Sequence, residues 1–216
     1  MKKLLSLLLG SIIFASILSL IYYQKTKLAV KSEISESVLR VNLPLYLTER
    51  QQEVLALAYD IAIKDGHSQP HLLQAILLKE TNAGEMKSYK VAGHELGLRP
   101  NERYYGLGQI KLSAAKEVIK KYPTLLNDFN FHTRTDEEII SKLIENDKFN
   151  ITIASKYLLI LRSLGYDTVK YLALAYNQGP GGAQNLDADE HPYSRGIVNY
   201  VMKLKKVYEN KRKEPV

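Results

Sequence analysis

The stretch from residue 71 to residue 80, HLLQAILLKE, constrains this chain more than any other part of it. Leu73, Ile76 and Leu77 recur at the spacing of one helix face. Glu80 continues that face in the last turn, because an Asn-Ala-Gly sequence follows and predicts a loop. Apolar surroundings raise the pKa of a carboxyl group, and a carboxylic acid that stays protonated near neutral pH suits general-acid catalysis. The alternative is that Glu80 turns towards solvent, as most helical glutamates do.

Composition limits the class of protein. A chain of 216 residues suits one domain with an appendage, and 45% hydrophobic residues are typical of a globular protein. The absence of cysteine excludes a disulfide scaffold and a cysteine nucleophile. The formal net charge of +7 favours an acidic partner. Nucleic acid is not expected as that partner, because no nucleic-acid-binding motif is present.

The N-terminal segment resembles a membrane anchor. Lys2 and Lys3 precede an uncharged, mainly apolar run over residues 4–23, and about 20 such residues can span a bilayer. The run ends in Ile-Tyr-Tyr, which suits a membrane interface better than a signal-peptide cleavage site. We therefore expect residues 1–24 to be an uncleaved transmembrane anchor in preference to a cleaved signal segment. Residues 25–45 are expected to be a stalk or linker.

The remainder of the chain predicts an all-α body of about seven helices, because helical periodicity continues and no alternating strand of useful length occurs. Residues 84–105 are expected to form an irregular excursion, and residues 211–216 a basic tail. The expected helices are 49–64, a helix capped by Ser68 that carries Glu80, a short helix capped by Ser113, 135–145 with a Thr135 capping box, 150–163, 168–177, and a last helix that carries Ile197, Val201, Leu204 and Tyr208.

Two further stretches carry groups suited to ligand binding. Residues 105–110, YGLGQI, combine two glycines, which let a ligand approach the backbone, with Gln109, which offers a donor and an acceptor. Residues 175–181, AYNQGPG, place Tyr176 and Asn177 at the end of an apolar helix. Each stretch alone fits an ordinary turn or helix end equally well.

The order of these features resembles the catalytic domain of the soluble lytic transglycosylase family. Glu80 at a helix end is followed by Gly-Leu-x-Gln-Ile, by Ala-Tyr-Asn-x-Gly-Pro-Gly, and by Tyr200-Val201 in a late helix. The resemblance covers about residues 50–208. It implies that residues 46–210 form a lysozyme-like, all-α catalytic domain of the goose-type lysozyme kind.

The motifs depart from the family pattern at three positions. Thr81 stands where the family usually has serine, and it keeps the hydroxyl. Gly108 replaces the methionine of Gly-Leu-Met-Gln, which removes a side chain from the expected wall of the cleft. Gln178 replaces the second alanine of Ala-Tyr-Asn-Ala-Gly.

The resemblance implies an enzyme that cleaves peptidoglycan between N-acetylmuramic acid and N-acetylglucosamine and leaves 1,6-anhydro ends. Glu80 would be the single general acid and base, and Tyr200 would be the tyrosine that hydrogen-bonds to it. No cofactor or metal is expected, since His94 and His191 are isolated in the sequence. The residues that would bind substrate are Thr81, Gly106, Gln109, Ile110, Tyr176 and Asn177.

Two other functions fit the same sequence. A hydrolytic muramidase on this fold would need a second carboxyl group, for which Glu85, Glu95 and Glu102 are the candidates. A non-catalytic peptidoglycan-binding or scaffold protein would need no second carboxyl group. All three functions imply peptidoglycan as partner, and the N-terminal segment implies contact with the membrane. For the transglycosylase, an envelope-spanning apparatus is a further candidate partner. The expected location is the inner membrane, facing the periplasm, or the periplasm itself if the segment is cleaved.

Overall fold

The computed structural model describes residues 47–86, 90–94 and 97–211, all of which lie in the second of two units, residues 1–39 and 40–216. The predicted anchor and stalk, Glu95 and the tail beyond Lys211 lie outside the described residues. Among the helices that are described, none is long and apolar enough to cross a membrane.

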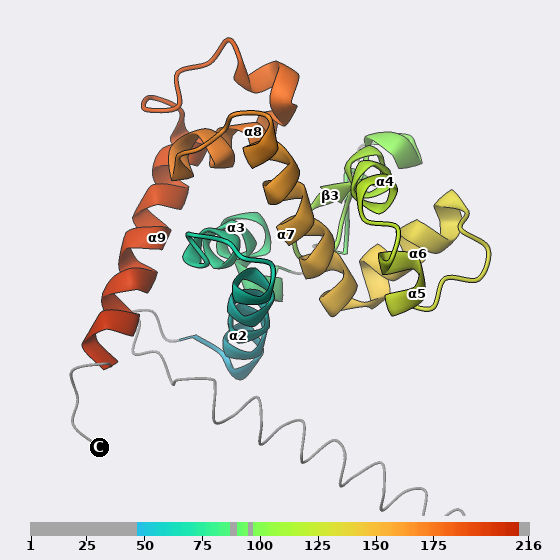
Figure 1. Ribbon diagram of the computed structural model, residues 1–216, viewed down its shortest axis with the longest axis horizontal. Coiled ribbons are helices and arrows are strands. Elements are labelled where there is room, and N and C mark those ends of the chain that lie inside the picture. The colour runs from blue at the N-terminus through green and yellow to red at the C-terminus, as the bar shows by residue number, and fades with distance from the viewer. Residues whose placement is uncertain (1–46, 87–89, 95–96, 212–216) are drawn as a thin grey trace, which may run out of the picture. The chain divides into compact units, whose positions relative to one another are not determined.

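The described part of the chain is mainly helical, which confirms the all-α prediction at that level (Figure 1). Two short 3₁₀ turns, Asn82–Gly84 and Pro100–Glu102, interrupt the excursion after Glu80. The α-helices are α2 (Glu49–Lys64), α3 (His71–Thr81), α4 (Leu112–Lys121), α5 (Leu125–Asp128), α6 (Asp136–Glu145), α7 (Asp147–Ser163), α8 (Val169–Ala183) and α9 (Pro192–Lys211).

A small antiparallel sheet, which the sequence did not predict, lies beside the helices. Its strands β1 (Val91–Ala92), β2 (Tyr104–Tyr105) and β3 (Ile110–Lys111) are two residues each. They pair in the order β1-β2-β3, with Tyr105 opposite both Val91 and Ile110. Two residues are too few to show an alternating pattern. The sheet fixes both ends of the Gly-Leu-x-Gln loop, since β2 leads into it and β3 leads out.

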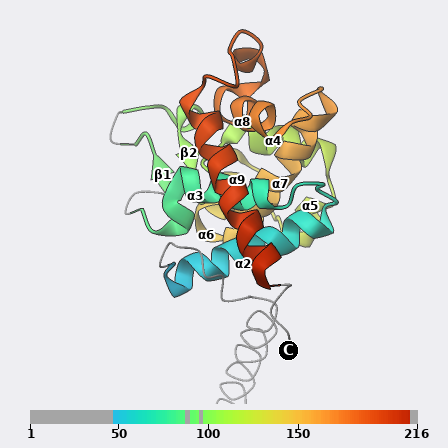
Figure 2. The ribbon, with the colours of Figure 1, turned by 90° about the vertical axis from the view of Figure 1, so that its left-hand side faces the viewer.

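Helix α3 is the centre of the core. Its apolar residues from Leu72 to Leu78 are at most 5% exposed, so the helix is buried on nearly every side and not along one stripe only. A helix that is apolar all round belongs inside a protein. Helices α2, α8 and α9 pack against it, and α9 crosses it in Figure 2. The last turn of α3, which carries Glu80, is where this central helix leaves the core.

The connection from α3 into the excursion is a left-handed turn held by α2. Asn82 and Ala83 have φ of 51° and 52°, and Gly84 has φ of 92°. Left-handed backbone is unfavourable for residues other than glycine, so the surroundings must hold it in place. Gln51 supplies one such contact, because its Nε2 donates to the carbonyl of Asn82 at 3.0 Å. The same Gln51 side chain accepts from the backbone of Thr48 in the capping box of α2.

Several predicted helix boundaries are confirmed. The bounds of α2 are those expected, and α3 contains Glu80 in its last turn. Thr135 caps α6 through a hydrogen bond from the backbone of Glu138. Gly179, where the sequence predicted a stop, has φ of 74° and separates the main part of α8 from a short last turn.

Other predicted boundaries are wrong. The N-cap of α3 is Pro70, without a side-chain cap, so Ser68 does not start this helix. Helix α4 begins at Leu112, which places Ser113 inside its first turn. Helix α7 begins at Asp147 because Asn146 caps it by accepting from the backbone of Phe149 at 2.9 Å.

A buried polar network joins the end of α2 to α7. Nε2 of His67 lies 2.9 Å from Oγ of Ser155, which itself donates to Asp65 at 2.6 Å. Because the single hydroxyl proton goes to Asp65, the imidazole must donate to Ser155. Lys156 completes the network with an ion pair to Asp65 at 2.7 Å. Burial lowers the pKa of His67, and the charge of Asp65 only partly opposes this effect.

This network predicts a stability that falls with acidification. The folded state binds a proton at His67 less readily than the unfolded state, so the contribution of His67 to the free energy of unfolding decreases as the pH falls below about 6.5, the ordinary pKa of histidine. His67→Gln should flatten this dependence, which urea unfolding at pH 7.5 and 5.5 would measure. The matched control is His132→Gln, at an exposed histidine. An unaltered pH dependence in His67→Gln would contradict the argument.

Candidate active site

Glu80 is held by a tyrosine at the start of α9. Its side chain is half-buried, and Oε1 accepts a hydrogen bond from the hydroxyl of Tyr193 at 2.5 Å. Burial raises the pKa of Glu80, while the hydrogen bond from Tyr193 and the charge of Lys79 act in the opposite direction. The raised pKa agrees with the expectation from the apolar face. Glu80 can therefore hold a proton at a higher pH than an exposed glutamate.

The sequence assigned this hydrogen bond to Tyr200, and the structure gives it to Tyr193 instead. The two tyrosines lie seven residues apart on α9, which places Tyr200 two turns or about 10 Å further along the axis. Tyr200 packs half-buried against the core. Tyr193 was missed because the last helix was expected only from the part that carries Ile197, after a loop that ran to Ser194. A proline at the first helical position, Pro192, is the signal that marks the true start.

Thr81 positions the glycine-bearing loop and does not face a substrate. Its side chain is fully buried, and its hydroxyl lies 3.2 Å from the carbonyl of Leu77 and 3.1 Å from that of Leu107. The same oxygen accepts from the backbone of Gly84 at 3.2 Å. The prediction that Thr81 binds substrate is therefore corrected: this residue fastens the loop to the last turn of α3.

Asn150 of α7 fixes the loop from its other side. The residue is fully buried, and its Nδ2 donates to the carbonyls of Tyr105 at 2.8 Å and Leu143 at 2.9 Å. Its Oδ1 accepts from the backbone of Gly108 at 2.8 Å. Gly106, with φ of 66°, packs so closely that a Cβ there would lie 2.2 Å from Nδ2 of Asn150. Gly106 is buried in this contact, which corrects its predicted role in substrate binding.

Tyr176 of α8 closes onto the same loop. Its hydroxyl donates to the carbonyl of Gly108 at 2.6 Å. A Cβ at position 108 would lie 2.9 Å from that hydroxyl and 3.1 Å from Cβ of Ala154. Glycine, in place of the methionine of the family pattern, is therefore what allows Tyr176 to come so near. Burial and the charge of Glu80 raise the pKa of Tyr176, so it remains a hydroxyl donor at all ordinary pH values.

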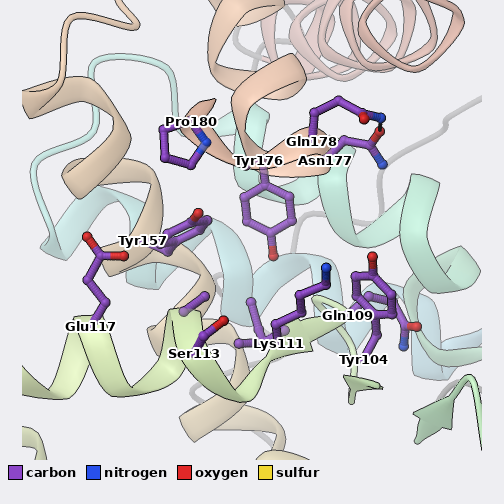
Figure 3. A pocket seen from close by; sticks show the side chains of 13 residues that line it. Tyr104, Gln109, Lys111, Ser113, Glu117, Tyr157, Tyr176, Asn177, Gln178 and Pro180 are labelled. Carbon is purple, nitrogen blue, oxygen red and sulfur yellow. Dashed lines mark hydrogen bonds between the residues drawn. The ribbon is translucent and has the colours of Figure 1, made fainter. Parts of the chain in front are cut away.

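Four of the predicted binding residues, Gln109, Ile110, Tyr176 and Asn177, line one cavity of about 320 Å³ (Figure 3). This volume is within the usual range for small-ligand sites. Ile110 is only 2% exposed, whereas the other three are half-buried. Glu80 is not part of the lining. Tyr176 links the cavity to Glu80. Its side chain lines the cavity, and burial and the charge of Glu80 raise the pKa of its hydroxyl group.

The other candidate carboxyl groups are engaged elsewhere. Glu85 accepts a hydrogen bond from Thr48 at 2.5 Å, and Glu102 forms an exposed ion pair with Arg99 at 2.9 Å. Within residues 47–86, 90–94 and 97–211, no group of three or more His, Asp and Glu side chains could hold a metal ion.

Comparison with known proteins adds no relative: no protein-family model, no curated protein and no solved structure matches this chain. The function must therefore be argued from the geometry around Glu80 and from the motifs that supply it.

The packing around Gly108 predicts that the methionine of the family pattern is harmful in this chain. Gly108→Met should disrupt the hydrogen bond from Tyr176 and destabilise the fold by about 1–3 kcal/mol, the usual cost of overpacking. Gly108→Ala should have a smaller effect in the same direction. Gly181→Ala is the matched control, because a Cβ there meets nothing within 4 Å. Thermal unfolding measures all three, and a Gly108→Met variant as stable as the parent protein would disprove this packing.

The hydrogen bond to Glu80 predicts opposite outcomes for two tyrosines on α9. Tyr193→Phe removes a donor that favours the carboxylate, so the pKa of Glu80 should rise further. Tyr200→Phe should leave that pKa where it is. The measurement is the carboxyl ¹³C chemical shift of Glu80 as a function of pH. If Tyr200→Phe moved the titration and Tyr193→Phe did not, the sequence-based assignment would be correct after all.

Proposed function

We propose that this protein is a peptidoglycan lytic transglycosylase that uses Glu80 as its single general acid and base. One observation carries the proposal: a half-buried carboxyl group of raised pKa, held by a tyrosine, ends the central helix beside the Gly-Leu-x-Gln loop. The candidate second carboxyl groups Glu85 and Glu102 are engaged with Thr48 and Arg99. The order of motifs along the chain supports the same class.

The proposed reaction needs one carboxyl group used twice. Protonated Glu80 gives its proton to the oxygen between N-acetylmuramic acid and N-acetylglucosamine, and the bond from that oxygen to the muramoyl C1 breaks. The carboxylate then accepts the proton of the muramoyl 6-hydroxyl while O6 bonds to C1. The proton count balances and no water is consumed. The acetamido group of the substrate can take the part of the second carboxyl group that ordinary glycosidases require.

The surroundings of Glu80 suit both halves of this cycle. Burial favours the protonated form, which donates in the first half. The hydroxyl of Tyr193 favours the carboxylate, which accepts in the second half. A group stabilised in both forms can pass from one to the other at little cost. Gln109, Tyr176 and Asn177 are the proposed sugar-binding groups of the adjoining cavity.

A hydrolytic muramidase is the main alternative. It would need a carboxyl group at a set distance from Glu80 to activate water. Glu85 and Glu102 are bound to Thr48 and Arg99, which disfavours them for that role. For the proposed function the domain must be exported, and the apolar segment at residues 4–23 is proposed to anchor it to the inner membrane, facing the periplasm.

The experiment is digestion of purified peptidoglycan by the full-length chain, with the products identified by mass spectrometry. Muropeptides lighter by one water than hydrolysis products are expected. Glu80→Gln should reduce their formation by at least about 10³-fold, since it can neither give nor take the proton. Glu85→Gln is the matched control and should retain activity. Full-mass reducing ends would instead establish the muramidase.

The loss of activity must not come from unfolding. Glutamine can still accept the hydrogen bond from Tyr193. Because the folded state raises the pKa of Glu80, ionising this group costs stability at pH values above about 4.5. Glu80→Gln should therefore be at least as stable as the parent protein at neutral pH, and the two should converge in acid. An inactive variant with a lower Tm at pH 7 would contradict this account.

A further inference from the structure

The cavity beside Gln109 has a charged wall that the proposed sugar contacts do not use. Ser113, Ala114 and Glu117 face it from α4 at the spacing of one helix face, and Lys111 faces it from β3. The ammonium of Lys111 lies 4.9 Å from the centre of the Tyr104 ring.

The two charges stand at different ends of this wall. Figure 3 shows Lys111 on the side of Tyr104 and Glu117 on the side of Tyr157. Burial and the nearby charge of Glu117 raise the pKa of Tyr157 to about 12, so this tyrosine stays neutral. Lys111 lies just before α4, and the helix rises by about 8 Å from Leu112 to Glu117. The cavity therefore presents a cation and an anion with tyrosine side chains between them.

Neither charge is held in an ion pair with a described residue, although Lys111 acts electrostatically on Glu102, which is itself paired with Arg99. Lys111 makes its ring contact with Tyr104, and no ion pair joins it or Glu117 to another described side chain. By contrast, Lys116 on the same helix pairs with Asp136 at 2.9 Å, away from the cavity. A ligand with one carboxylate and one ammonium would complement this wall.

Peptidoglycan, the substrate of the proposed function, can carry both a carboxylate and an ammonium only in its peptide. The amino sugars within a glycan strand carry acetamido and hydroxyl groups, and the lactyl carboxyl group of N-acetylmuramic acid is taken up in the amide bond to the peptide. The sugars of the intact substrate therefore give a cation and an anion nothing to pair with. The peptide attached to the strand carries carboxylates, and it carries an ammonium where a side chain ends in an amine. Tyr157 and Tyr176 offer aromatic faces for the apolar part of such a side chain.

We propose that the cavity binds the peptide of peptidoglycan, at a residue whose side chain ends in a free amine. Lys111 pairs with a peptide carboxylate and Glu117 pairs with the ammonium. This inference rests on the proposed function, because it takes peptidoglycan as the substrate. It adds selectivity for the peptide to the cleavage of the glycan.

The experiment measures binding to the full-length Glu80→Gln variant, which holds the substrate without cleaving it. Three ligands of equal glycan length are compared: one without peptide, with its lactyl carboxyl groups capped as neutral amides, one with a peptide that carries a free amine, and one with that amine acetylated. The free-amine ligand is expected to bind tightest. Added Glu117→Gln should abolish the preference for the free amine over the acetylated form, a change of about two- to fivefold. Added Lys111→Met should reduce the preference for peptide over bare glycan by a similar factor.

Both preferences should weaken at high ionic strength, because the charges are accessible to solvent. The controls are Lys120→Met and Glu145→Gln, which remove exposed charges outside the cavity and should preserve both preferences. The inference would be overturned if the three ligands bound equally well. It would also be overturned if Glu117→Gln and Lys111→Met weakened the binding of all three ligands by the same factor.

The two proposals fail in different ways. Cleavage of peptidoglycan by the parent protein without any peptide preference would keep the proposed function and remove the peptide site. Peptide selectivity that depends on Lys111 and Glu117, in a protein that cleaves no glycan, would keep the site and remove the catalytic function. That result would identify a peptidoglycan-binding protein.

Discussion

The burial of α3 on all sides is the constraint on which the rest of the structure depends. A helix without a polar face must be covered from several directions, and α2, α8 and α9 supply the cover. Only its last turn can meet solvent, so Glu80 stands at the boundary between the core and the exterior. The covering helix α9 brings Tyr193 to this boundary, and the loop fastened by Thr81 brings Gln109. The site is therefore a consequence of how the central helix is enclosed.

The chemistry of Glu80 depends on a balance between two opposing effects. Burial disfavours its charge, and a single neutral donor, Tyr193, partly restores it. Because burial is the larger effect, the proton is retained more tightly than in an exposed glutamate. A cation placed as close as Tyr193 would lower the pKa of Glu80 by more than burial raises it, and Glu80 would then stay a carboxylate. The choice of a tyrosine in that position is what keeps the group available as an acid.

The sequence predicted those parts of the fold that local pattern controls. The bounds of α2 and the placement of Glu80 follow from capping residues and apolar spacing. Asn150 could not be found this way, because two of the three backbone groups that it binds, those of Tyr105 and Gly108, lie 45 and 42 positions away in the sequence. Tyr193 was missed for a different reason: the last helix was recognised only by its apolar residues from Ile197 onwards, although Pro192 opens it. The strands β1 to β3 are shorter than any recognisable period.

The side chain of Gln51 takes part in two structures at once. It belongs to the cap of α2 through Thr48, and it also holds the left-handed turn at Asn82 that follows the last turn of α3. Opening either segment breaks a hydrogen bond that the other one uses. We therefore expect the amide protons of the first turn of α2 and of the turn after Glu80 to be coupled in hydrogen exchange, although 31 positions separate Gln51 from Asn82 in the chain.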